Sequence, residues 1–339
     1  MQEKINKIIW IFVIILIIAL LLVLVFDKKE KEYTSNIFYM DTHIYVKIVS
    51  DNEEKANKIL SNIENIYKTY HELSDKYNEY EGIKNLYYLN YNNDTSEYIE
   101  IDEKLYDLLQ FGIDAYNKTN GLIDISIGNV LDIWKSYRTS EYGVPTLEEL
   151  QAVKTDKIED IILKDGKIKN NHVNIDLGAL TKGYTTEKVK EYLISEGVTN
   201  YIVNAGGNVI VGENVDKSKY SIGLEDPDDT TGIYKVIYGK NISIITSGGY
   251  NRYYEWNGQK YNHIINPDTL FPTNYMKSVS VITNNSAYGD MLSTMLFLMD
   301  IDSGLEYVNS VDGIEAIWYT NDNQIITSNG IKDYEQKWF

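Results

Sequence analysis

One uninterrupted apolar run constrains this 339-residue chain more than any other feature. Residues 8–26, "IIWIFVIILIIALLLVLVF", contain no charged side chain. As a helix, this run would rise about 28 Å, close to the thickness of bilayer hydrocarbon. We therefore expect a transmembrane helix over 8–26, preceded by a short tail, residues 1–7. A cleaved signal peptide is the alternative, but the run is long for one and no small-x-small cleavage site precedes Asp27.

Lysines on both sides of the run leave its orientation open, because two precede it and three follow it closely. Long domains translocate largely regardless of flanking charge, so we expect a single-pass protein of the cell membrane whose body lies on the extracytoplasmic face. The charged stretch "DKKEKEYTSN", residues 27–36, is typical of a stalk. From 37 to 339 the pattern is that of one globular domain.

Composition excludes several classes of function. The net charge of −18 argues against a nucleic-acid-binding surface. The chain has no cysteine, which excludes disulfides, thiolate metal sites and cysteine nucleophiles. Only two arginines are present, Arg138 and Arg252. We therefore expect anions to be recognised by backbone N–H groups, lysine or a metal cation.

Strand-like and helix-like segments alternate irregularly in the globular part. Residues 51–80 show the apolar spacing of an amphipathic helix, and Asn257-Gly258 predicts a tight hairpin turn within 252–265. A doubly wound fold would require regular strand–helix alternation, which is missing. The sequence therefore predicts the α+β class, with mixed, mainly antiparallel sheets and packed helices.

Three glycine-containing stretches have the composition of phosphate-binding loops. In "VNIDLGALTKGYTTEKV" a strand-like piece leads to a lysine at a helix start, where free N–H groups can hold phosphate. In "NAGGNVIVG" the two glycines would let a ligand approach the backbone, and "TSGGY" has the small residues of an anion nest. A strand–helix junction, a bulge and a hairpin turn are the respective alternatives. The candidate residues are Asp176, Lys182, Gly206, Gly207, Thr246, Ser247 and Gly248.

Two further places combine polar groups in a way that suggests chemistry. Asp290 and Thr294 stand four residues apart in an apolar helical stretch, hence on one helix face. A carboxylate and a hydroxyl suit a hard cation such as Mg²⁺. Taken alone, however, the pair is better explained by a helix-dipole partner and a core hydroxyl. His263 lies in a dense turn motif, where it is either structural or a general acid/base or phosphate contact.

Taken in order, these stretches resemble the FAD:protein FMN transferase family, often called ApbE. Its members split the pyrophosphate of FAD and attach FMN by a phosphoester to a threonine, sometimes serine, hydroxyl of a partner protein, releasing AMP with the help of Mg²⁺. The resemblance implies one T-fold-like α+β domain with FAD in a cleft. It rests on the blocks "MDTHIYVKI" (40–48), "GLIDISIGNVLDIW" (121–134), "IDLGALTKGYTTEKV" (175–189), "NAGGNVIVG" (204–212), "IGLEDP" (222–227), "TSGGYNRYYEWNGQKYNHIINPDTLFP" (246–272) and "SVSVITNNSAYGDMLSTMLF" (278–297).

The resemblance also assigns positions in the flavin site. Met40 matches a methionine near the flavin, and Tyr77 matches an aromatic residue that packs on the isoalloxazine. The implied FAD contacts are Met40, Tyr77, Leu122, Ile123, Asp124, Asp176, Lys182, His263 and Ile264.

The metal ligands are likewise implied by the resemblance: the side chains of Asp290 and Thr294 and the backbone oxygen of Ala179. Two departures bear on this chemistry. Asp41 replaces a glycine that many members have after the methionine, and Ser293 stands where some members place a second carboxylate. We therefore expect a sparse metal site.

The function implied is that of a membrane-anchored family member, which uses FAD as substrate and Mg²⁺ as cofactor. Its partner would be an extracytoplasmic acceptor flavoprotein with a threonine or serine flavinylation site. His263 and Asp176 are both candidates for the base that takes the acceptor proton. Two alternatives remain: a Mg²⁺-dependent FAD pyrophosphatase that gives FMN and AMP, and a non-catalytic, membrane-anchored flavin-binding or delivery protein.

Overall fold

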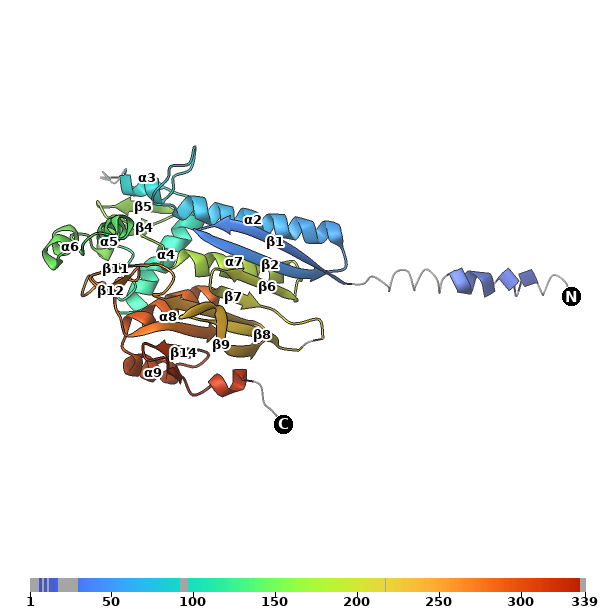
Figure 1. Ribbon diagram of the computed structural model, residues 1–339. Coiled ribbons are helices and arrows are strands. Elements are labelled where there is room, and N and C mark those ends of the chain that lie inside the picture. The colour runs from blue at the N-terminus through green and yellow to red at the C-terminus, as the bar shows by residue number, and fades with distance from the viewer. Residues whose placement is uncertain are drawn as a thin grey trace.

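A computed structural model describes residues 6–7, 9–10, 12–17, 30–91, 97–216 and 218–335. Its centre is an 8-stranded sheet in the order β1-β2-β6-β7-β10-β13-β14-β15, in which every neighbouring pair is antiparallel (Figure 1). The predicted α+β class is confirmed. The strands are β1 (Lys31–Tyr39), β2 (Thr42–Ser50), β6 (Tyr201–Ala205), β7 (Asn208–Val211), β10 (Ile242–Gly248), β13 (Met276–Thr283), β14 (Glu315–Thr320) and β15 (Ile325–Thr327).

Smaller antiparallel sheets surround this one. The predicted hairpin turn at Asn257-Gly258 is confirmed: both residues have positive φ, as a two-residue hairpin loop requires. The smaller sheets are β3 (Ile99–Glu100) with β5 (Lys167–Asn170) and β4 (Ile161–Lys164), β8 (Tyr220–Asp226) with β9 (Asp229–Gly239), and β11 (Tyr253–Trp256) with β12 (Gln259–Asn262).

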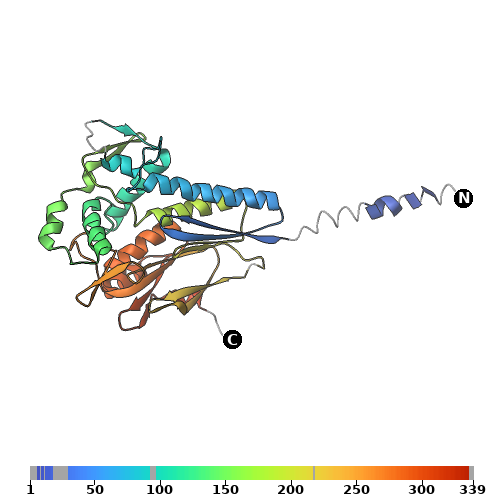
Figure 2. The ribbon, with the colours of Figure 1, turned by 45° about the horizontal axis from the view of Figure 1, so that its top comes forward.

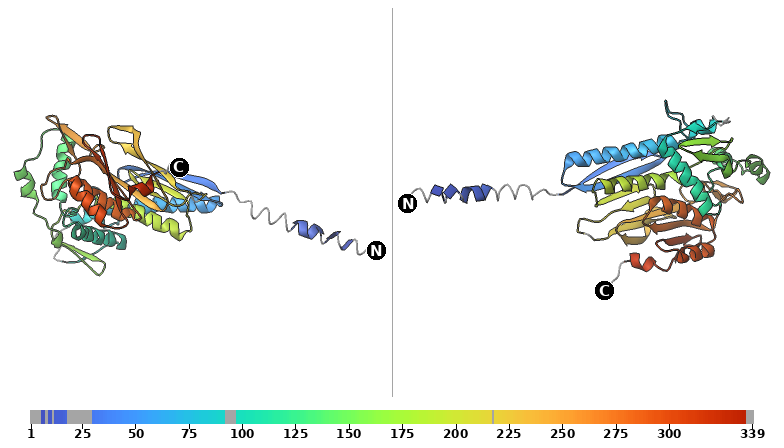
Figure 3. Two further views of the ribbon diagram at one scale, coloured as in Figure 1. Left: turned by 90° about the horizontal axis from the view of Figure 1, so that it is seen from below. Right: turned by 180° about the vertical axis from the view of Figure 1, so that it is seen from behind.

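Three helices cover one face of the large sheet, and Figure 3 shows them side by side from behind: α2 (Glu53–Ser74), α7 (Thr181–Ser195) and α8 (Ser286–Leu298). The predicted helix within 51–80 is α2. The remaining helices are α3 (Leu86–Tyr91), α4 (Glu103–Lys118), α5 (Gly128–Ser140), α6 (Leu147–Val153) and α9 (Ile301–Ser310), with short 3₁₀ turns η1 (Ile158–Asp160) and η2 (Ile331–Tyr334).

The large sheet separates two groups of core side chains, because successive side chains along a strand point to opposite faces. On β10, Ile245 faces α8, and an added Cβ at Gly289 of that helix would lie 2.2 Å from its Cδ1 atom. Its neighbour Ile244 points the other way and packs with Leu224 of β8. The β8–β9 hairpin therefore lies on the face opposite to the helices (Figure 2).

The N-terminal strand differs from the prediction. Strand β1 begins at Lys31, so 31–36 belong to the sheet, although their charges predicted a stalk over 27–36. The physical reason is the period-two pattern: Tyr33 and Ile37 pack against the core while the intervening polar residues face out. Strands β1 and β2 are joined by a turn in which Met40 and Asp41 both have φ of 55°.

The predicted membrane segment cannot be compared in the same way. Most of 8–26, like 1–5, lies outside the residues that the structure describes, which include 9–10 and 12–17 as helix. Within the described part of the chain, no helix is both long and apolar enough to cross a membrane. The transmembrane helix stays a prediction.

Candidate active site

A cavity of about 1070 Å³ opens beside the β1–β2 turn and reaches the first turn of α7 and the side of α8 that carries Asp290 and Thr294. It brings together segments from the whole length of the domain. All positions marked by the sequence line it: Met40, Tyr77, Leu122, Ile123, Asp124, Asp176, Ala179, Lys182, Gly206, Gly207, Thr246, Ser247, Gly248, His263, Ile264, Asp290 and Thr294.

Asp290 is held where α7 crosses α8. Its Oδ2 atom accepts a hydrogen bond of 2.7 Å from the backbone N–H of Gly183, and the residue is only 5% exposed. A Cβ on Gly183 would lie 2.3 Å from the Asp290 Cβ and 2.7 Å from the Ser286 carbonyl oxygen. The crossing therefore requires glycine at 183, and that glycine fixes the carboxylate.

We expect Gly183→Ala to destabilise the protein by about 1–3 kcal/mol, because the added methyl overlaps a helix backbone that cannot move freely. Urea unfolding would measure the loss. The matched control is Gly197→Ala, at the end of α7, where no atom lies within 4 Å of the added Cβ. Because Gly197 has φ of +74°, this control carries only backbone strain. If Gly183→Ala bound Mg²⁺ with the same affinity as the wild type, the role of Gly183 in fixing the Asp290 carboxylate would be contradicted.

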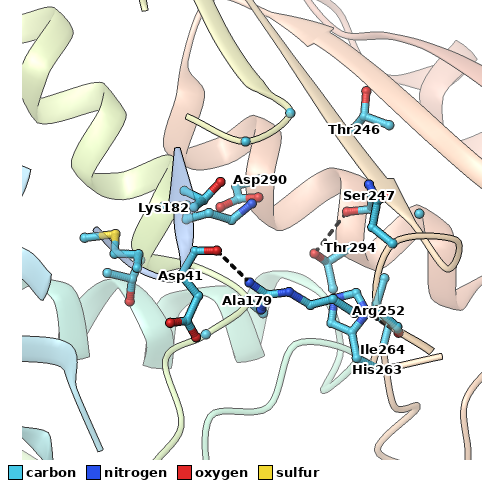
Figure 4. Close-up of a pocket in the computed structure, with 18 of the residues that line it drawn as sticks. Asp41, Ala179, Lys182, Thr246, Ser247, Arg252, His263, Ile264, Asp290 and Thr294 are labelled. Carbon is cyan, nitrogen blue, oxygen red and sulfur yellow. Dashed lines mark hydrogen bonds between the residues drawn. The ribbon is translucent and has the colours of Figure 1, made fainter. Parts of the chain in front are cut away.

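The electrostatics of Asp290 suit a cation. Burial raises the pKa of the Asp290 carboxyl, while the Lys182 ammonium and the Gly183 N–H oppose this effect. Figure 4 shows the Lys182 side chain beside Asp290, yet no ion pair with Asp290 is found among the described residues. A buried carboxylate without an ion-pair partner is costly unless a cation neutralises it.

The other donors near Asp290 are also oxygens. Thr294 and Ala179 line the same cavity. The described residues contain no cluster of three or more His, Cys, Asp or Glu side chains that could hold a metal ion. One carboxylate, one hydroxyl and one carbonyl fit Mg²⁺, which keeps several positions for phosphate and water.

Ser293 explains why the donor set is small. Its Oγ lies 2.8 Å from the Ser247 Oγ, and it donates to the Asp290 carbonyl oxygen at 3.1 Å. Ser293 is buried and does not line the cavity. The Ser247 Oγ also lies 3.4 Å from the Thr294 Oγ1, so Ser247 links the strand β10 to the face of α8 that carries Asp290 (Figure 4).

The His263 ring is oriented by the backbone carbonyl group of Arg252. Its Nδ1 atom lies 3.2 Å from the Arg252 carbonyl oxygen. A carbonyl can only accept, so Nδ1 carries the proton and Nε2 keeps a lone pair. Burial, and then the charges of Arg252 and Arg138, lower the pKa of His263 to about 4. The imidazole is therefore neutral at physiological pH and able to take a proton.

Both arginines of the chain line this cavity, beside the lysines and backbone groups expected to recognise anions. Arg138 comes from α5, and Arg252 precedes β11. The Arg252 guanidinium donates to the Asp41 carbonyl oxygen at 3.2 Å (Figure 4). Burial and then the charge of Arg252 lower the pKa of Arg138. Converging cations in an acidic protein are expected where an anionic substrate binds.

We expect Arg138→Gln to raise the pKa of His263, because one of the cations that disfavour the imidazolium is removed. If neutral His263 is the active form, activity is lost as pH falls through its pKa. The acidic limb of the variant's kcat profile then moves from near pH 4 toward the ordinary imidazole value of about 6.5. Arg138→Lys, which keeps the charge, is the control. If the acidic limbs of the two kcat profiles, of the wild type and of Arg138→Gln, coincided, an effect of Arg138 on the pKa of His263 would be excluded.

Two partners fix the Asp176 side chain. Its Oδ1 accepts from the Gly178 N–H at 2.8 Å, and its Oδ2 lies 3.3 Å from the Lys76 ammonium. Lys76 is buried and also pairs with Asp132 at 2.9 Å. These partners occupy Asp176, so it is better suited to positioning than to proton removal.

Tyr77 presents an aromatic face in the cavity. It is 50% exposed, and the Lys135 ammonium lies 3.2 Å from the centre of its ring. Sequence reasoning missed Lys76, Lys135 and Arg138 as cavity residues. They belong to no motif, and only the packing of α5 beside the end of α2 brings them to Tyr77.

The two glycines at 206 and 207 form the turn between β6 and β7, with φ of 59° and 88°. A Cβ on Gly206 would lie 2.0 Å from the Thr42 Oγ1, so this turn packs directly against the β1–β2 turn. On the opposite wall, the Asp124 Oδ1 accepts from the Ser126 N–H at 2.8 Å, which fixes the segment that includes Leu122 and Ile123.

Comparison with known proteins gives a consistent result. A model of the ApbE family matches residues 40–318. The FAD:protein FMN transferase of Klebsiella pneumoniae (strain 342) is 28% identical over 238 residues, which cover 68% of this chain and 73% of that protein. That of Haemophilus influenzae is 29% identical over 303 residues, 85% of this chain and 86% of its own length.

Solved structures agree. The ApbE protein of Thermotoga maritima superimposes with a TM-score of 0.79 at 27% identity, covering 91% of this chain and all of its own. The flavin transferase ApbE of Vibrio cholerae has a TM-score of 0.75 at 23% identity, with 91% of this chain and 100% of that chain covered, which supports the fold alone.

Proposed function

The chain belongs to the ApbE family, and from this premise we propose that it transfers FMN from FAD to a threonine or serine hydroxyl of a partner protein with the help of Mg²⁺. Transfer of FMN from FAD to a protein is the activity by which the curated relatives are named. The observation that carries the proposal is Asp290: a buried carboxylate without an ion-pair partner among the described residues, in a cavity that also contains a neutral histidine and both arginines.

Asp290, Thr294 and the Ala179 carbonyl would hold the Mg²⁺ ion. When bound, Mg²⁺ neutralises phosphate charge and stabilises the charge that develops on the AMP leaving group. The chain's own part is to fix the donors: Gly183 orients the Asp290 carboxylate, and Ser247 lies beside the Thr294 hydroxyl. Lys182 adds a positive charge at the same end of the cavity.

Proton removal falls to His263 in this proposal. The acceptor Oγ–phosphorus bond forms while the phosphorus–oxygen bond to AMP breaks, and the acceptor proton passes to the Nε2 of His263. The depressed pKa of His263 supports this role because the ring is unprotonated before reaction. Arg138 and Arg252 supply positive charge beside it for the phosphates.

The test is mass spectrometry of an extracytoplasmic acceptor flavoprotein co-expressed with the chain, with FMN expected on one threonine or serine. A parallel incubation with FAD and Mg²⁺ alone separates the alternatives. AMP release at the same rate without acceptor would indicate a pyrophosphatase. Tight FAD binding with no AMP under either condition would indicate a delivery protein.

We also propose that residues 8–26 anchor the domain to the cell membrane with its body on the extracytoplasmic face. The hydropathy of the run supports this, and β1 begins only a few residues after it, at Lys31. Fractionation of the full chain and of residues 30–339 tests the anchor, and protease added to intact spheroplasts tests the orientation. A full chain recovered in the soluble fraction would contradict it.

A further inference from the structure

The cavity extends beyond the positions implied for FAD, along one strand of the β8–β9 hairpin. We call this extension the β8 groove. It is bounded by β8, by the outward face of the β1–β2 hairpin and by a floor from β6 and β7. Its lining residues are Asn36, Phe38, His43, Tyr45, Asn204, Val209, Ile222, Gly223, Leu224 and Glu225.

Strand β8 offers an unpaired edge to this groove. In the described part of the chain it pairs with β9 alone. Four β8 residues line the cavity, whereas β9 contributes none, so the edge away from β9 faces the groove. A strand edge with unpaired N–H and C=O groups is a template for an extended segment of another chain.

The opposite wall of the groove carries exposed aromatic side chains. On β2, Ile44 and Val46 face the helices, and Tyr45 between them points to the groove. On β1, Phe38 is 58% exposed, and its ring lies against that of His43 at 5.1 Å between centroids. Aromatic side chains next to a free strand edge can cover the side chains of an added strand.

The inner end of the groove meets the transfer centre. Glu225, near the end of β8, lies close enough to Tyr250 for its charge to help raise the pKa of the Tyr250 hydroxyl, after the larger effect of burial. Two residues after Tyr250 comes Arg252, whose carbonyl oxygen holds His263. A threonine hydroxyl is only one carbon removed from its own backbone. The acceptor main chain must therefore enter the cavity itself, whose lining includes both the β8 residues and His263.

We propose that an extended segment of the acceptor protein binds in the β8 groove as an added strand on β8, which brings its hydroxyl to His263. This inference rests on the proposed function. FAD is not the expected occupant, because the positions implied for FAD, such as Met40, Tyr77 and Asp176, lie outside the groove. Strand pairing uses backbone groups for affinity, and side chains at alternate positions of the acceptor would contact the walls of the groove.

Disulfide trapping tests the placement, and the cysteine-free chain makes single thiols simple to introduce. The probe is a pool of ten-residue peptides, each with one threonine and one cysteine at a varied distance from it, selected for flavinylation by the wild type. Ser221→Cys is exposed on β8; Val236→Cys is the matched control on the same hairpin, opposite Gly223 on β9. A peptide strand paired with β8 lies one strand spacing, about 4.8 Å, nearer to residue 221 than to residue 236 on β9. A disulfide needs Cβ atoms about 3.5–4.5 Å apart.

We expect Ser221→Cys to trap peptides whose cysteines stand at alternate positions, and Val236→Cys to trap at least tenfold less. Equal trapping by both variants, with normal flavinylation, would overturn the docking site and leave the transferase function intact. No flavinylated peptide or protein with the wild type would instead contradict the function. Protection of the residue 221 thiol by FAD alone, or a disulfide between two copies of Ser221→Cys, would show that another occupant fills the groove.

A second measurement requires no variant of the chain. Selected peptides are N-methylated at one backbone position at a time. Methylation that removes a hydrogen bond to β8 should lower kcat/KM for the peptide about three- to tenfold, at every second residue only, with the KM for FAD unchanged. A fall in kcat/KM that does not alternate along the peptide would overturn strand pairing.

Discussion

Asp290→Ala is expected to abolish FMN transfer and to leave a folded protein. Without the carboxylate, Mg²⁺ would keep only a hydroxyl and a carbonyl from the chain, too few to hold a hard cation at the pyrophosphate. Loss of several kcal/mol of charge stabilisation corresponds to about a 10³-fold fall in kcat or more. The measurement is flavinylation of the acceptor followed by mass spectrometry over a range of Mg²⁺ concentrations.

Thermal unfolding separates this effect from misfolding. Metal-free Asp290→Asn should be at least as stable as the metal-free wild type, because a charge whose pKa is raised by burial is removed while an acceptor for the Gly183 N–H remains. Mg²⁺ should stabilise the wild type by about 2.7 kcal/mol at 100 times its Kd and should leave the variant unchanged. Transfer by purified Asp290→Ala in EDTA would refute the metal assignment.

A matched carboxylate elsewhere controls for general damage. Asp300 caps α9 and accepts from the Ser303 N–H at 2.9 Å. It does not line the cavity. Asp300→Ala should cost about 1 kcal/mol of stability and leave transfer unchanged. A stability loss alone would then be excluded as the cause of an inactive Asp290 variant.

The sequence predicted those parts of the fold that local chemistry determines. Asn257-Gly258 predicts its hairpin because these residues tolerate the positive φ that the turn needs. The start of β1 escaped prediction because its lysine and glutamate dominate the composition. Its inward Tyr33 becomes meaningful only once β2 and α2 supply a core.

The sequence predicted those residues of the candidate site that lie in short motifs with a characteristic order along the chain. Asp290 and Thr294 share a helix face, but it was the order of the other motifs along the chain, and not this spacing alone, that indicated joint action. Arg138, Lys76 and Lys135 carry no such signal: they meet Tyr77 and His263 through contacts between segments far apart in the sequence. The small number of arginines gave no indication that both line one cavity.

Ser293 shows how a departure from a motif is resolved by packing. As a missing second carboxylate, it predicts a weaker metal site. In the fold, its hydroxyl turns to Ser247 and lies outside the cavity lining, so the position supports the strand that flanks Thr294. The smaller donor set around Asp290 is thus a consequence of how α8 packs on β10, and it makes each remaining oxygen donor more important.

The choice between the two candidate bases gives the second large expected effect. His263→Ala should lower kcat by about 10²–10⁴, the contribution typical of a positioned base, because its neutral Nε2 has no substitute. Asp176→Asn should lower kcat by less than about tenfold and act mainly on FAD affinity. Its carboxylate is already engaged by the Gly178 N–H and the Lys76 ammonium.

Chemical rescue distinguishes a base from a structural residue. Added imidazole should restore part of kcat in His263→Ala. Among the described residues the ring hydrogen-bonds to the Arg252 carbonyl oxygen alone, and its removal leaves space open to the cavity. FAD affinity, measured by flavin fluorescence, should change little in this variant. The assignment would be reversed if Asp176→Asn lost as much kcat as His263→Ala at unchanged FAD affinity. In that case the role of Lys76, which also pairs with Asp132, would be to tune Asp176 for proton removal.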